Sequence, residues 1–168
     1  YYREDIFDKY NLTIPNVWDD YYTYIPTLQK YNMQAEAPQA GVMIYQYGGL
    51  MYKYDNSRQV NARASNIDSD LYLKLFDKQN AFYTEYKCPI TMDGHSRFRT
   101  GEVPMIIGTL STWKNLYAQA PEIRGLWKFH VLPGVEQEDG TVNREQIPTV
   151  TYSAIYAAGA NHDGAWEF

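Results

Sequence analysis

Residues 103–121 read VPMIIGTLSTWKNLYAQAP, and this stretch decides the predicted fold. Its first five residues, 103–107, form an apolar run typical of a buried strand. Residues 108–112 combine a glycine with hydroxyl side chains, and they are expected to turn that strand into a helix. The helix is predicted over about 113–120, and Pro121 ends it. The stretch therefore predicts a strand, a turn and a helix in succession.

Two further strands are predicted downstream. Residues 126–132 form an apolar run that Pro133 and Gly134 close, and residues 149–158 are rich in Thr, Tyr and Ile, which favour strands. Strands that alternate with helices are typical of layered α/β domains. We therefore expect one α/β domain over residues 1–168, with a mixed sheet flanked by helices.

Helical patterns dominate the first half of the chain. A short helix is expected over 5–10. Across 16–31, aromatic and aliphatic residues recur every three or four positions, which indicates an amphipathic helix that Pro26 should kink or interrupt. The same spacing predicts a second long helix over 68–86. The apolar run 40–47 fits either a helix or a strand.

The composition excludes several classes of function. The 168 residues include 15 Lys and Arg against 20 Asp and Glu, so the formal net charge is −5 and a basic face for DNA or RNA is disfavoured. The chain is 45% hydrophobic and 16% aromatic, which predicts a folded protein. No window approaches the roughly 18 uninterrupted apolar residues of a membrane-spanning helix. The single cysteine, Cys88, forms no disulfide within the chain.

The sequence carries no local motif for a cofactor or a metal ion. Neither the dinucleotide fingerprint nor the phosphate loop that ends in lysine is present. The three histidines, His95, His130 and His162, lie more than 30 positions apart, without the spacing of a zinc site. We expect no bound metal and no cofactor.

The turn after residues 103–107 is the most informative candidate site. Thr109 and Ser111 stand at a helix start, where backbone N–H groups remain free, and α/β sheets bind ligands at this end of a strand. Trp113 follows in the first helical turn and offers a flat apolar face. This combination suits a sugar, whose C–H faces stack on aromatic rings while its hydroxyls form hydrogen bonds. Ordinary helix capping beside a core tryptophan explains the same residues equally well.

Four motifs resemble those of the extracellular solute-binding proteins of bacterial ABC importers, in the branch that is similar to maltose-binding protein. They follow the order found in the second lobe of that family and span nearly the whole chain. The motifs are IPNVWDD at 14–20, RFRTGEVPM at 97–105, APEIRGLWKFHVLPG at 120–134 and AWEF at 165–168.

The resemblance implies one lobe of a type II periplasmic-binding-protein fold, with the first lobe absent from this chain. It implies an extracellular, cell-surface or periplasmic lipoprotein that catalyses no reaction. Such a protein holds a polar solute, here an oligosaccharide, and delivers it to an ABC permease. Family positions carried over to this chain imply solute contacts from Glu36, Gln39, Thr109, Ser111, Trp113, Tyr152 and Ser153. Lobe closure would supply the affinity, so this lobe alone is expected to bind weakly.

Two alternatives stay open on the sequence alone. One is a carbohydrate-active enzyme in which Glu36 and one of Asp19, Asp20 or Asp93 form the acid/base pair. The other is a structural or sensory domain with a tyrosine-rich protein interface in place of a ligand site. Because the helix expected from Asn161 stops after about one turn, we also expect the chain to be a piece of a longer protein.

Overall fold

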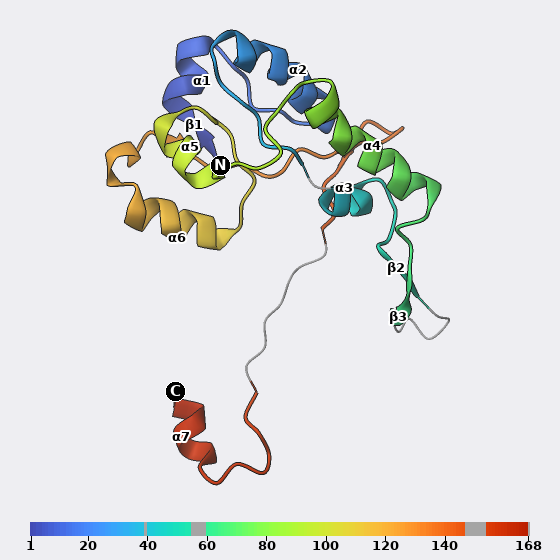
Figure 1. The fold of residues 1–168 in the computed structure, drawn as a ribbon. Helices are drawn as coiled ribbons and strands as arrows, with labels where there is room; N and C mark the ends of the chain where they lie inside the picture. The colour runs from blue at the N-terminus through green and yellow to red at the C-terminus, as the bar shows by residue number, and fades with distance from the viewer. Residues whose placement is uncertain (39, 55–59, 147–153, 168) are drawn as a thin grey trace.

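Helices supply most of the regular structure in the computed structural model, which describes residues 1–38, 40–54, 60–146 and 154–167. Helix accounts for 46% and strand for 9% (Figure 1). A short 3-10 helix, η1, spans Pro121–Ile123. The α-helices are α1 (Glu4–Tyr10), α2 (Trp18–Lys30), α3 (Ala40–Gln46), α4 (Asp70–Thr84), α5 (Gly94–Thr100), α6 (Leu110–Gln119) and α7 (His162–Glu167).

Strands form only two-stranded antiparallel pairs within the described residues. The pairs are β1 (Tyr2–Arg3) with β4 (Trp127–Lys128), β2 (Tyr52–Tyr54) with β3 (Val60–Ser65), and β5 (Val135–Glu136) with β6 (Val142–Asn143). The prediction of an α/β fold, one lobe of the type II periplasmic-binding-protein kind with a mixed sheet flanked by helices, is therefore wrong for the described part of the chain.

The apolar run 103–107 shows why that prediction failed. The run is largely buried, but the one bridge that the structure describes for it joins Met105 to Tyr2. A longer ladder is blocked because Pro104 has no N–H and because α1 already begins at Glu4. The side chains of the run enter hydrophobic clusters between helices instead of covering one face of a sheet.

The other predicted strands are also corrected. Only β4 forms within the apolar run 126–132. Of the candidate strand over 149–158, residues 149–153 lie outside the described residues, and residues 154–158 form no strand.

The helix predictions are confirmed more closely. Helices α1, α2 and α4 lie where the sequence predicts them, and the ambiguous run 40–47 forms α3. Helix α6 begins at Leu110, three residues before the predicted start. Helix α2 continues through Pro26 without interruption, and Pro26 is exposed while Ile25 and Leu28 are buried.

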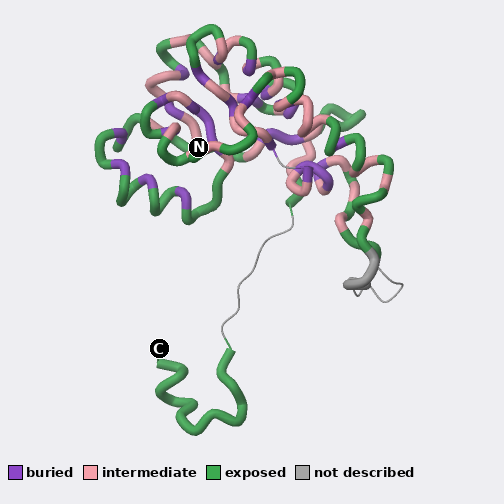
Figure 2. The backbone as a smooth tube through the Cα atoms, in the orientation of Figure 1, coloured by how far each residue is buried: buried purple, intermediate pink, exposed green. Residues whose placement is uncertain are grey.

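The buried side chains form two hydrophobic clusters. The larger one joins α2, α3 and α4 and includes Trp18, Tyr21, Ile44, Leu75 and Phe82. Figure 2 shows that the buried residues, in purple, are concentrated in the helical body. The smaller cluster joins α5, α6 and η1, and its buried members are Phe98, Val103, Ile106, Leu116, Ala120 and Ile123.

The C-terminal helix differs from the others because none of its residues is buried (Figure 2). Asn161 caps it, accepting a hydrogen bond from the Gly164 N–H at 2.9 Å, so the helix start predicted at Asn161 is confirmed. None of the helices in the described ranges combines the length and apolar character needed to cross a membrane.

Candidate functional site

Helix α6 presents two aromatic rings to solvent. Trp113 and Tyr117 are four residues apart, so they lie on the same face of the helix. The adjacent face carries Thr112 and Leu116, which are buried. Trp113 is 38% exposed and Tyr117 is 49% exposed, and their rings stack with centroids 5.5 Å apart and an interplanar angle of 17°. The outer face of α6 therefore carries an exposed, stacked aromatic pair, which we call the aromatic platform.

A tight turn brings a second aromatic segment beside this platform. Pro121 begins η1, and Gly125 follows with a φ of 83°, a conformation that glycine adopts at little cost. The Leu126 N–H donates to the Ile123 carbonyl at 3.0 Å and closes the turn. The chain then runs back through β4, which places Trp127 next to the platform.

These segments enclose an open groove of about 400 Å³, within the usual size range of ligand sites. We call it the aromatic groove. It is lined by Trp113, Tyr117, Arg124, Gly125, Trp127, Lys128 and Phe129.

One wall of the aromatic groove holds an unsatisfied donor. The Trp127 Nε1–H is buried and has no hydrogen-bond partner among the described residues. Because this nitrogen has no exposed surface, it is not among the donors that a ligand in the open groove can reach. Tyr1 packs against the two aromatic residues of this wall. Its ring centroid lies 5.8 Å from that of Trp127 and 6.1 Å from that of Phe129.

The residues predicted around the start of α6 are only partly in this site. Trp113 lines the groove, and Thr109 and Ser111 are exposed near the start of the helix but do not line it. The expectation of free N–H groups is wrong at Thr109, whose N–H donates to Thr112 Oγ1 at 3.2 Å. The Thr109 carbonyl accepts a hydrogen bond from the Tyr1 hydroxyl at 2.6 Å.

Glu36 lies outside the aromatic groove, and its side chain forms a hydrogen bond with the backbone. It is half-buried, and its Oε2 accepts a hydrogen bond from the Ile107 N–H at 2.6 Å. Burial raises the pKa of the Glu36 carboxyl above its ordinary value, although the Ile107 N–H opposes part of that rise. Glu36 does not line the aromatic groove, so the structure does not bring it together with Trp113. The other three predicted ligand residues, Gln39, Tyr152 and Ser153, lie outside the described residues.

The carboxylates considered as enzymatic partners of Glu36 have local structural contacts. Asp20 Oδ2 accepts from the N–H groups just before α2, at 3.1 and 3.2 Å. Asp19 forms an ion pair with Lys78 at 3.5 Å. Asp93 caps α5 through Ser96, whose N–H lies 3.1 Å and whose hydroxyl lies 2.6 Å from the carboxylate. These contacts favour helix capping and ion pairing over acid/base catalysis.

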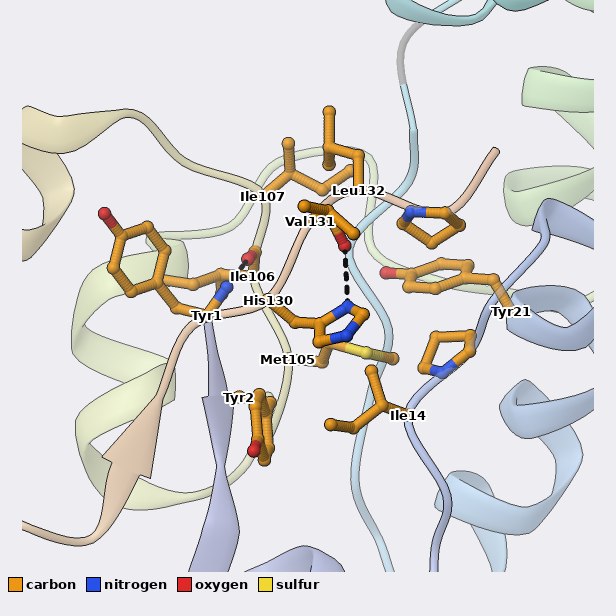
Figure 3. Close-up of a pocket in the computed structure, with 12 residues that line it drawn as sticks. Tyr1, Tyr2, Ile14, Tyr21, Met105, Ile106, Ile107, His130, Val131 and Leu132 are labelled. Atoms are coloured by element: carbon orange, nitrogen blue, oxygen red, sulfur yellow. Dashed lines mark hydrogen bonds between the residues drawn. The ribbon is translucent and has the colours of Figure 1, made fainter. Parts of the chain in front are cut away.

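A second cavity lies beside the N-terminal strand (Figure 3). It measures about 40 Å³, which is room for a water molecule but not for a sugar ring. Its lining is largely apolar, with Met105 and Ile14 near the ring of His130 (Figure 3). The His130 Nδ1 lies 3.1 Å from the Val131 carbonyl oxygen. The cavity is therefore too small for a sugar, and the aromatic groove is the better candidate site.

The chain was compared with known protein families, curated proteins and solved structures. No family model, curated protein or solved structure matches the chain.

Sequence reasoning found Trp113 and missed the rest of the groove. The spacing of Trp113 and Tyr117 signals a shared helix face, and Trp127 and Phe129 form a second aromatic segment. Neither signal shows that the two segments meet. That contact depends on the turn at Gly125.

Proposed function

We propose that this chain binds carbohydrate through the aromatic groove, as part of an extracellular solute-binding protein. The observation that carries the proposal is the exposed, stacked platform of Trp113 and Tyr117. A pyranose ring has an apolar C–H face that packs on such a platform, and its hydroxyls reach donors at the rim. The four sequence motifs that resemble those of solute-binding proteins support the same proposal.

In this proposal the chain makes and breaks no covalent bond and uses no cofactor. The groove is open on one side, so another part of the parent protein would cover the bound sugar and supply the remaining affinity. Delivery of the sugar to an ABC permease at the cell surface or in the periplasm belongs to the same proposal.

Titration of the 168-residue chain with neutral oligosaccharides, followed by tryptophan fluorescence and by calorimetry, tests this function. We expect weak binding, with a dissociation constant of about 1 mM, because only one side of the ligand is covered. Trp113→Ala should weaken binding about tenfold or more, since it removes half of the stacking platform.

Trp166→Ala is the matched control. Trp166 is 82% exposed on α7 and does not line the groove, so its removal should leave the affinity unchanged. Equal losses in the two variants, or no binding of any oligosaccharide up to about 50 mM, would contradict the proposal.

A protein interface is the second candidate function. Phe129, in the groove lining, is 69% exposed, and Leu110, outside the lining, is 72% exposed, so the exposed apolar surface continues beyond the groove. Exposed apolar surface of this kind occurs at protein interfaces. A chain that self-associates in sedimentation velocity and binds no oligosaccharide would favour this function, and Phe129→Ser should then restore the monomer.

A further inference from the structure

We propose that the saccharide held in the aromatic groove carries an anionic group, a carboxylate or a sulfate, and that Arg124 binds this group. The inference rests on the proposed function and names the class of sugar. It follows from the position and pairing of the charged residues at the groove.

Arg124 is fixed against the aromatic platform. Its guanidinium carbon lies 4.4 Å from the centroid of the Tyr117 ring, and its Nη2 donates to the Tyr117 carbonyl at 3.0 Å. A cation over an aromatic face is held by the electron density of the ring, and stacking leaves the edge of the guanidinium free. Because the guanidinium covers Tyr117, a ligand would lie on Trp113, and the remaining N–H donors of Arg124 are available to it.

Arg124 also lacks an acidic partner. Among the ion pairs of the described residues, none includes Arg124, although it is exposed. The nearby Glu122 carboxylate is paired with Arg99 at 2.6 Å. The other cation of the groove, Lys128, forms an ion pair with Glu4. Arg124 is thus the groove cation whose charge no protein carboxylate neutralises in the described structure.

The lining itself contains no acidic residue. This contrasts with the chain as a whole, whose net charge of −5 repels anions. A planar guanidinium presents two parallel N–H groups that match the oxygens of a carboxylate or sulfate. A pyranose ring on Trp113 would place such a substituent beside Arg124, because both residues line the same groove. Charge and geometry therefore favour an acidic sugar over a neutral one.

The test is a titration of the 168-residue chain with three oligosaccharides of equal length: a neutral one, a uronate and a sulfated one. At low salt we expect the better of the two acidic ligands to bind about tenfold more tightly than the neutral one, because hydrogen bonds to a charged group are the stronger kind. The acidic ligand that binds more tightly identifies the anion. Added salt should reduce the preference.

Three variants separate a charge effect from a packing effect. Arg124→Gln should abolish the preference while the neutral ligand still binds, and Arg124→Lys should retain part of it. Lys114→Gln removes one exposed charge of α6 outside the groove lining and should leave the preference intact.

The outcomes distinguish this inference from the proposed function. Binding of the neutral oligosaccharide with equal or greater affinity would overturn the inference while the proposed function stands. An equal loss for all ligands in Arg124→Gln would also overturn it, because Arg124 would then only support Tyr117. Failure of all three ligands to bind would overturn both.

Discussion

At the scale of single residues, Glu36 is a charged acceptor that joins two distant parts of the chain. Its Oε2 accepts from the Ile107 N–H, and its backbone carbonyl accepts from the Tyr21 hydroxyl at 2.6 Å. Since burial raises the pKa of Glu36 in the folded protein, the folded state binds more protons than the unfolded state at pH values just above 4.5. The free energy of unfolding contributed by this group should therefore fall as pH rises from about 4.5.

We predict that Glu36→Gln removes this fall while preserving the fold, because the amide oxygen still accepts from Ile107. Urea unfolding of wild type and variant between about pH 4.5 and 7 measures the difference in slope. Glu36→Ala is the control for the hydrogen bond and should lose about 1–2 kcal/mol of stability. A wild-type pH profile that parallels that of Glu36→Gln would contradict the assignment.

At the scale of elements, the end of α5 depends on a glycine. Gly101 has a φ of 84° and stops the helix, and its N–H donates to the Phe98 carbonyl at 3.2 Å. A Cβ at this position would lie 2.8 Å from Cδ1 of Ile6. We predict that Gly101→Ala costs about 2 kcal/mol, from strain in the left-handed backbone and from contact with Ile6.

Gly140→Ala is the matched control for that prediction. Gly140 has a φ of 80°, and no atom lies within 4 Å of the position its Cβ would occupy, so this variant carries the backbone strain alone. Its expected cost is about 1 kcal/mol. Ile6→Val removes Cδ1 and should narrow the gap between the two glycine variants in thermal unfolding. A gap that persists with Ile6→Val would show that contact with Ile6 is not its cause.

At the scale of the whole molecule, the two hydrophobic clusters are joined by the N-terminal strand. Arg3 is buried in β1, and its Nη1 donates to the Phe98 and Arg99 carbonyls at 3.0 Å each. Its side chain also forms hydrogen bonds of 2.8 and 2.7 Å to both oxygens of Asp5. The smaller cluster, which underlies the aromatic groove, is thereby connected to the larger one through β1 and α1.

We therefore expect the clusters to unfold in one transition. Phe82→Ala in the larger cluster and Phe98→Ala in the smaller one should each cost about 3–5 kcal/mol, because both side chains are fully buried. Far-ultraviolet circular dichroism and tryptophan fluorescence should report the same midpoint for each variant. Separate midpoints would show that the groove-bearing cluster is an independent unit.

The sequence by itself determined most of the helices and the cap of α7, but it did not predict α5. The spacing of Trp18, Tyr21 and Ile25 predicted α2, and Asn161 predicted the start of α7. These predictions are confirmed because helical hydrogen bonds join residues only four positions apart, so local sequence contains most of the information. Trp113 was identified from local sequence too, because the residues around it predict a helix and place it near the helix start.

The tertiary structure alone decided that no central sheet forms in the described residues and that a groove does. A strand needs a partner far away in the chain, and the apolar run 103–107 finds only a two-residue neighbour in β1. The groove likewise needs the Gly125 turn to bring the segment that holds Phe129 to the same groove as Trp113, an arrangement that neither segment encodes separately. For Glu36 the tertiary structure overrode the expectation from sequence. Glu36 was predicted to contact a ligand, but the N–H of Ile107, 71 positions away, donates to its carboxylate.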